Sequence, residues 1–146
     1  MPRLLVFVWI ACAAILGVGC SQAEDPDVDR GAVEAAVRAF YQLLEAYDYD
    51  GLRAASSPDF EILEAGLRMD MDDFVSMLQG MESRGVQLSF DLADFDTEVS
   101  GDVGYTTYRM VSGGGSAYLE GLILLRTGSG WVADRAFSTR AAEVNP

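Results

Sequence analysis

The sequence predicts an α+β domain, with helices in its first half and an antiparallel sheet of four strands after them. Two patterns carry this prediction. Apolar residues recur every three or four positions between residues 32 and 47, which is the period of an amphipathic helix. Beyond Gly85 apolar and polar residues alternate, and glycine-rich turns separate the alternating segments. The change of period indicates where helices give way to strands.

The first predicted helix covers residues 32–47. Its buried stripe consists of Val33, Val37, Phe40, Tyr41, Leu44 and Tyr47. Asp29 precedes the helix, where an acidic side chain suits the positive end of the helix dipole. A turn over residues 48–51 and a short helical segment over residues 52–55 lead to the next element.

A short strand and a second helix follow. Residues 60–64 alternate, which places Phe60, Ile62 and Glu64 on one face of a strand. Asp70 has an acidic partner three residues later, which is typical of a helix N-cap. We therefore predict a helix from Met71 to Ser83.

Four alternating segments form the predicted sheet: residues 86–99, 103–111, 117–126 and 131–139. The first segment changes phase, because its apolar residues occupy even positions up to Leu92 and odd positions from Phe95 onward. Such a slip indicates a β-bulge near Ala93 and Asp94.

Composition excludes several classes of function. The formal charge is −13, so the surface repels nucleic acid. The chain has no histidine, and all ten of its basic residues are arginine. Ser-His-Asp triads, Cys-His pairs, histidine-metal sites and lysine Schiff bases are therefore excluded. Carboxylates, tyrosines, serines and arginines remain for any chemistry.

An apolar segment lies near the start of the chain. Residues 4–18 (LLVFVWIACAAILGV) carry no charge over 15 positions and follow Arg3. This length suits an export signal, whereas a membrane-spanning helix needs about 20 apolar residues. A permanent transmembrane anchor is the alternative. The segment ends in Gly19-Cys20-Ser21, which resembles the lipobox of bacterial lipoproteins, where a small residue precedes the cysteine that becomes the mature N-terminus.

The lipobox resemblance implies a signal peptide over residues 1–19 and a lipidated Cys20. Residues 21–30 (SQAEDPDVDR) are polar and acidic and contain Pro26, which indicates a flexible tether after Cys20. Several acyl chains on Cys20 would hold the protein on a membrane. Ser21 implies sorting to the outer membrane of a Gram-negative cell, so we expect the domain on the periplasmic face of that membrane. The other cysteine, Cys12, lies inside the signal, so the mature chain forms no internal disulfide.

The motifs of the remaining chain resemble the nuclear transport factor 2-like superfamily, also called cystatin-like, and most closely its SnoaL-like domains. The resemblance rests on EAYDYDGL (45–52), SPDFEIL (57–63), GLRMDMDDFVSML (66–78) and GWVADRAFSTR (130–140) in this order. It covers residues 31–142 and leaves 143–146 as a tail. It implies a cone in which N-terminal helices pack on a strongly curved antiparallel sheet, a pocket at the open end, and a homodimer formed through the sheet.

The resemblance also suggests site residues. Steroid isomerases and polyketide cyclases of the superfamily carry a carboxylate base at the position of Glu64. That residue shares its strand face with Phe60 and Ile62, so desolvation would raise its pKa; a solvated or arginine-paired strand end is the alternative. Phe40 takes the place of an oxyanion-binding tyrosine but has no hydroxyl group, and Tyr41 lies about 100° further around the helix.

Side chains on the long strands are further candidates for the pocket. Arg109, Glu120 and Arg135 lie on neighbouring strands and could bind an anionic or carbonyl ligand, although alternation also places charged residues on the solvent face. Tyr105, Tyr108 and Tyr118 line the cavity or cover the sheet.

Acidic clusters at residues 70–73 and 91–96 lack the central glycine and terminal glutamate of an EF-hand loop. We interpret them as a helix cap and a solvated bulge, so the sequence implies no metal site and no cofactor.

Two functions follow from these observations. The favoured one is a non-catalytic, membrane-anchored module that binds a small apolar, amphipathic or carbonyl-bearing molecule, or a protein partner. The alternative is an isomerase, dehydratase or cyclase that uses Glu64 as a general base on a carbonyl substrate.

Overall fold

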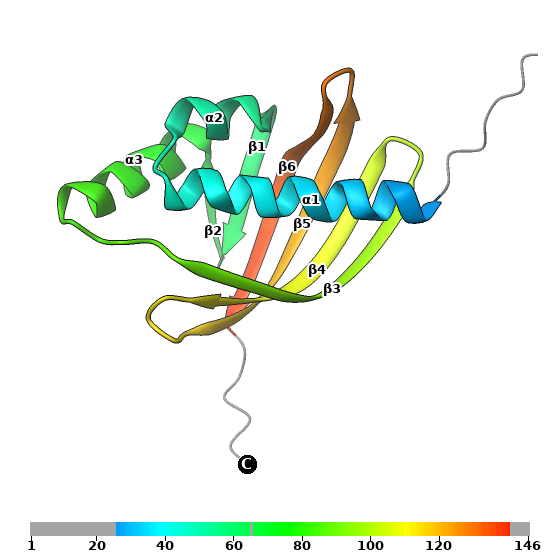
Figure 1. Ribbon diagram of the computed structural model, residues 1–146. Coiled ribbons are helices and arrows are strands. Elements are labelled where there is room, and N and C mark those ends of the chain that lie inside the picture. Colours follow the sequence, from blue (N-terminus) through cyan, green and yellow to red (C-terminus); the bar gives the residue numbers. More distant parts are fainter. Residues whose placement is uncertain (1–25, 65, 141–146) are drawn as a thin grey trace, which may run out of the picture.

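The computed structural model describes residues 26–64 and 66–140, in which helices pack on a curved sheet (Figure 1). The elements follow the order α1 (Pro26–Glu45), α2 (Tyr49–Ala54), β1 (Ser56–Glu64), β2 (Leu67–Asp70), α3 (Met71–Ser83), β3 (Phe90–Ser100), β4 (Val103–Ser112), β5 (Ala117–Thr127) and β6 (Gly130–Arg140). The predicted signal, Cys20 and the C-terminal tail lie outside the described residues. Of the described helices, none is long and apolar enough to cross a membrane.

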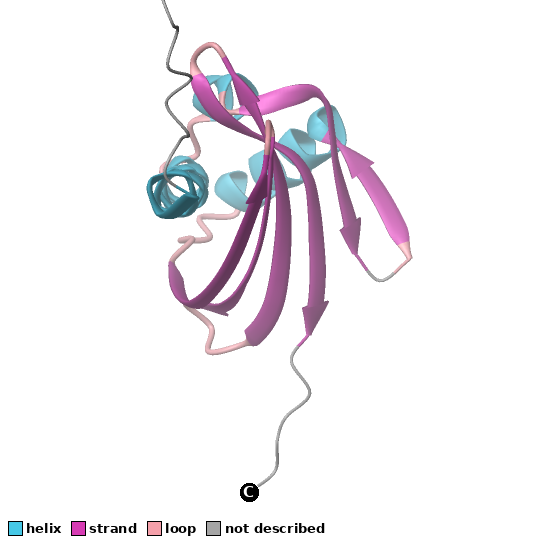
Figure 2. Ribbon diagram, turned by 90° about the vertical axis from the view of Figure 1, so that its right-hand side faces the viewer, coloured by secondary structure: helices cyan, strands magenta, loops and turns pink. Residues whose placement is uncertain are grey.

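The strands form one sheet in the order β2-β1-β6-β5-β4-β3. From β3 to β6 it is the predicted antiparallel meander. The sheet has six strands rather than the predicted four, because β1 pairs parallel with β6 and β2 pairs antiparallel with β1. The long strands bend together and wrap around the helices (Figure 2). The fold is therefore α+β, as predicted.

Helix α1 begins earlier than predicted. Its first residue is Pro26, which suits the first helical turn because that position needs no N–H donor. Asp29, expected before the helix, lies within it and forms an ion pair of 2.7 Å with Arg126 on β5. Residues 26–30 therefore belong to the folded domain and not to the flexible tether.

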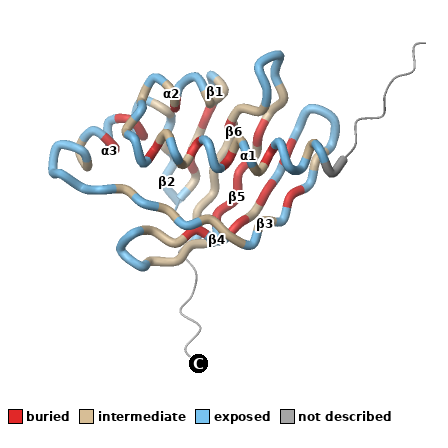
Figure 3. The backbone as a smooth tube through the Cα atoms, viewed as in Figure 1, coloured by how far each residue is buried: buried red, intermediate tan, exposed pale blue. Residues whose placement is uncertain are grey.

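The core lies between α1 and the inner face of the sheet (Figure 3). Of the predicted stripe, Val33, Val37, Phe40 and Leu44 are buried there, whereas Tyr41 and Tyr47 are half-buried. The sheet contributes further buried residues: Tyr108, Met110, Leu122, Leu124 and Ala133. Gly104 on β4 allows the close approach of α1, since a Cβ atom at this position would lie 2.7 Å from Cγ2 of Val33.

The predicted bulge bends β3. The register between β3 and β4 shifts between Ala93 and Asp96, and Asp94 takes a φ of 56° at this point. An extra residue in one strand increases the local bend. The strand begins at Phe90, so Val86 and Leu88, which were expected in it, precede it.

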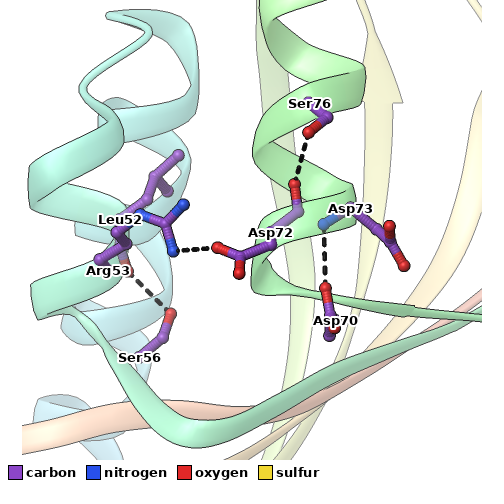
Figure 4. Close-up of polar contacts among 7 residues, drawn as sticks. All are labelled: Leu52, Arg53, Ser56, Asp70, Asp72, Asp73 and Ser76. Atoms are coloured by element: carbon purple, nitrogen blue, oxygen red, sulfur yellow. Dashed lines mark hydrogen bonds and ion pairs between the residues drawn. The ribbon is translucent and has the colours of Figure 1, made fainter.

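Helix α3 begins as predicted. Asp70 is its N-cap and accepts a hydrogen bond of 2.9 Å from the backbone N–H of Asp73 (Figure 4). Arg53 on α2 forms an ion pair of 2.7 Å with Asp72, so the two helices are joined at their ends. The ion pair links α3 to α2, and α3 lies beside β1 and β2.

Candidate functional site

A cavity of about 340 Å³ lies between α1, α3 and the sheet. Its wall is mostly apolar and is formed by Leu44, Ile62, Phe74, Met77, Leu78, Met81, Leu88, Phe90, Met110 and Ala136. Its polar side chains are Tyr41, Glu64, Ser112, Tyr118, Glu120 and Ser138. This combination of an apolar wall with a few polar groups is typical of a small-molecule site.

Four polar side chains form one row across the sheet. Ser138 on β6 pairs with Glu64 on β1 and with Glu120 on β5, and Glu120 in turn pairs with Tyr108 on β4. Residues that pair directly across strands have side chains on the same face. The alternation of the strands therefore brings Glu64, Ser138, Glu120 and Tyr108 to the inner face at one level.

Glu120 is the buried carboxyl group of this row. It is only 8% exposed, and its Oε1 accepts a hydrogen bond of 2.8 Å from the Ser138 hydroxyl. Burial raises the pKa of Glu120 from 4.5 to about 7; the bond from Ser138 opposes this rise, and the nearby charge of Glu64 adds to it. Near neutral pH, Glu120 can therefore either donate or accept a proton.

Tyr41 and Tyr108 extend the row toward α1. The Tyr108 hydroxyl donates to the Tyr41 hydroxyl over 3.2 Å, and the two rings meet edge to face. Burial raises the pKa of both phenols, so both remain protonated at neutral pH. Because Tyr41 accepts from Tyr108 and lines the cavity, its own O–H proton can be donated to a ligand.

Glu64 lies at the end of the row, where it both lines the cavity and is exposed to solvent. Within the described residues its side chain makes no hydrogen bond or ion pair. Of the two alternatives expected for Glu64, the exposure of the side chain fits the solvated strand end, whereas no arginine partner is seen among the described residues. A ligand in the cavity can reach Glu64 and Glu120 together, because one strand separates the two residues.

The structure brings five of the predicted pocket residues together: Tyr41, Ile62, Glu64, Tyr118 and Glu120. Phe40 and Phe60 are not among the lining residues; they pack on each other in the core, with ring centroids 5.8 Å apart. Tyr41, which was expected to point away from the position of Phe40, is the aromatic residue of α1 that reaches the cavity.

Three predicted pocket residues lie on the outer face of the sheet instead. Tyr105 is 44% exposed, Arg109 forms an ion pair of 3.0 Å with Asp94, and Arg135 lies 3.8 Å from a carboxylate oxygen of Glu61. Tyr105 and Arg109 have the opposite strand parity to the buried Tyr108, so they cannot share its face.

Sequence reasoning missed Ser138 and the contribution of α3. The signal for Ser138 was its parity with Ala136 on β6, but a bulge near Asp134 shifts the register along the strand. The apolar stripe of α3 was recognised, yet its contact with a cavity depends on how the helix packs. Among the described residues, no group of three or more acidic, cysteine or histidine side chains could hold a metal ion.

The comparisons with known proteins concern fold. No family model matches the chain, and no curated protein matches it. Several solved structures are similar. A provisionally named dehydratase of the nuclear transport factor 2-like family from Streptomyces avermitilis aligns with a TM-score of 0.70 and 20% identity, covering 81% of this chain and 99% of that one.

Two further solved structures have a similar fold. A nuclear transport factor 2-like protein with a cystatin-like fold from Novosphingobium aromaticivorans has a TM-score of 0.69 and 17% identity, with 81% of this chain and 85% of that one covered. A provisionally named ketosteroid isomerase from Shewanella frigidimarina has a TM-score of 0.63 and 16% identity, with 74% and 94% covered. Together with the curved sheet and its helices, these similarities show that the chain has the nuclear transport factor 2-like, or cystatin-like, fold.

Proposed function

We propose that this protein is a binding module for a small, largely apolar molecule, which enters the cavity between α3 and the sheet. The observation that carries the proposal is the cavity itself. Its volume of about 340 Å³ lies at the lower end of the range for small-molecule sites. A wall of aliphatic, aromatic and methionine side chains favours an apolar body, and the polar row fixes its orientation.

A fluorescent ligand tests this proposal. Prodan, a neutral naphthalene ketone, changes its emission when it leaves water for an apolar site. We expect saturable binding to the full-length protein in a nonionic detergent. Ala136 lines the cavity, so Ala136→Phe fills it and abolishes binding. Ala39 is exposed on α1 and does not line the cavity, so Ala39→Phe keeps binding. Equal binding by both variants contradicts the proposal.

The membrane anchor belongs to the same proposal. A lipid on Cys20 would hold the domain at a membrane. Since α1 begins at Pro26, the connection spans residues 20–25 rather than 20–30. Labelled fatty acid is expected to be incorporated into the wild-type chain and not into Cys20→Ser. Incorporation into neither would favour the short transmembrane alternative.

A second candidate function is proton transfer on a carbonyl substrate. The observation that favours it is the pair of carboxyl groups at different degrees of burial in one cavity. Glu64 would remove a proton from the carbon next to the carbonyl. Protonated Glu120 and the Tyr41 hydroxyl would donate hydrogen bonds to the oxygen as it becomes negative. The similarity to provisionally named dehydratase and isomerase structures supports this candidate only at the level of fold.

Exchange of carbon-bound hydrogen distinguishes the two functions. β-Tetralone has acidic hydrogens beside its carbonyl and a bicyclic body suited to the cavity. A catalytic protein accelerates their exchange for deuterium, and Glu64→Gln removes that acceleration. A module that only binds leaves the exchange rate at the buffer value, although β-tetralone still displaces Prodan.

A further inference from the structure

The charged side chains among the described lining residues of the cavity are all acidic. Among its described lining residues, Glu64 and Glu120 are the only ionisable acids apart from tyrosines, and no arginine takes part. The chain as a whole carries a formal charge of −13. A cavity with this lining repels anions, and the field of the whole protein adds to that repulsion.

The buried carboxyl group lacks a full set of partners. Ser138 donates to Oε1 of Glu120, whereas Oε2 accepts no hydrogen bond from the described residues. The side chain is more than nine-tenths buried and lines the cavity. A donor supplied by a ligand would satisfy Oε2, and a positively charged donor would also offset the cost of burying the carboxylate.

Several aromatic rings and sulfur atoms surround the same space. Tyr41, Phe74, Phe90 and Tyr118 line the cavity, together with Met77, Met81 and Met110. Aromatic faces attract organic cations, and thioether groups adapt to ligands of varied shape. The apolar wall therefore accepts the body of a ligand whose charged end meets the carboxylates.

Resting on the binding function proposed above, we propose that the cavity selects amphipathic organic amines, whose ammonium group binds Glu120 and Glu64 while the apolar body contacts α3. An alkylammonium group like that of lysine keeps its proton to about pH 10, so it is a cation throughout the neutral range. Its N–H groups can reach Oε2 of Glu120 and the carboxylate of Glu64.

The proposal predicts that amine binding is coupled to the release of a proton from Glu120. The groups that face Glu120 are Glu64 on β1, Ser138 on β6, Tyr108 on β4 and Tyr41 on α1, and none of them is a cation. An ammonium group favours the ionised form of Glu120. Amine binding at about pH 6 should therefore release close to one proton and strengthen as the pH rises.

Three indoles that differ in one group provide the test: tryptamine is a cation, tryptophol is neutral and indole-3-acetate is an anion. Isothermal titration of the full-length protein in a nonionic detergent measures each affinity. We expect tryptamine to bind at least about tenfold more tightly than tryptophol, and indole-3-acetate to bind most weakly. Titrations in buffers with different ionisation enthalpies count the released proton.

Glu-to-Gln substitutions at different positions show which carboxyl group causes the preference for tryptamine. Glu120→Gln is expected to remove both the tryptamine preference and the proton release while tryptophol binding persists, and Glu64→Gln weakens the preference in part. Glu98→Gln makes the same change of charge at an exposed position and leaves both properties intact.

Each outcome has one meaning. Equal affinity for tryptamine and tryptophol, or tighter binding of indole-3-acetate, overturns the amine proposal and leaves the binding function in place. If neither the indoles nor Prodan binds, both proposals fail. A tryptamine preference that survives Glu120→Gln together with Glu64→Gln also overturns the amine proposal, because the selecting charge would then lie elsewhere.

Discussion

Glu64 and Glu120 both pair with Ser138, one from each neighbouring strand, so two carboxyl groups lie on the same face of the sheet with one residue between them. Glu64 is open to solvent, whereas Glu120 is buried. Burial raises the pKa of Glu120 to about 7, so this side chain can exchange a proton in the neutral range. Both proposed functions use this combination of one exposed and one buried carboxyl group.

The pH dependence of stability tests the burial of Glu120. Because its pKa is about 7 in the fold and 4.5 ordinarily, the folded state binds more protons than the unfolded state between these values. Its contribution to the free energy of unfolding therefore falls as the pH rises from about 5 to about 8, by on the order of 3 kcal/mol. Glu120→Gln should remove this fall.

Urea denaturation at both pH values measures the effect. Glu98→Gln, an exposed substitution with the same change of charge, should keep the wild-type slope. Identical slopes in the wild type and Glu120→Gln would show that Glu120 ionises freely in the folded protein.

The hydroxyls of Tyr41 and Tyr108 should be energetically coupled. Tyr108→Phe removes the donor of their 3.2 Å bond, and Tyr41→Phe leaves the Tyr108 hydroxyl without its acceptor. Each substitution is expected to cost about 1 to 2 kcal/mol. The double variant should lose less than the sum by about 0.5 kcal/mol or more, measured by thermal unfolding. Additive losses would mean that the hydroxyls do not interact.

Local signals predicted much of the fold. The start of α3 follows from its N-cap, and the bulge of β3 follows from a change in which residues of the strand are apolar. Each signal depends only on residues that are close together in the sequence. Strand β2 was missed because its four residues precede the N-cap directly and have no alternation long enough to recognise. The parallel pairing of β1 with β6 joins segments that are far apart in the sequence, so local periodicity cannot predict it.

The candidate site was predicted less completely for a related reason. Both faces of β5 carry apolar residues, since Leu122 is buried on the inner face while Leu119 is 54% exposed on the outer one. Alternation alone therefore could not decide which parity faces the core. Glu120 was weighed equally with Arg109 and Arg135, and only the packing of α1 on the sheet separates them.

The cap of α3 gives a prediction about stability. Asp70→Ala removes the acceptor of the Asp73 N–H and should lower the free energy of unfolding by about 1 kcal/mol. Asp59→Ala, at an exposed position of β1, should change it little. Chemical denaturation of both variants measures the difference, and equal stabilities would exclude a capping role for Asp70.

The outer face of the sheet offers a test of the expected homodimer. Tyr105 and Leu119 are exposed there, beside the partly buried Ile123 and Phe137. If two copies associate through this face, Leu119→Arg places a charge in the interface and should convert dimers to monomers. Sedimentation velocity in a nonionic detergent measures the change. A wild-type monomer would contradict the expectation.

The methionine methyl groups report on whether a small molecule binds in the cavity. Met77, Met81 and Met110 line the cavity, whereas Met69 and Met71 do not. In isotope-labelled full-length protein, Prodan should shift the methyl resonances of the first three in a saturable manner and leave the other two in place. Uniform small shifts, or saturable shifts confined to Met69 and Met71, would contradict binding in the cavity.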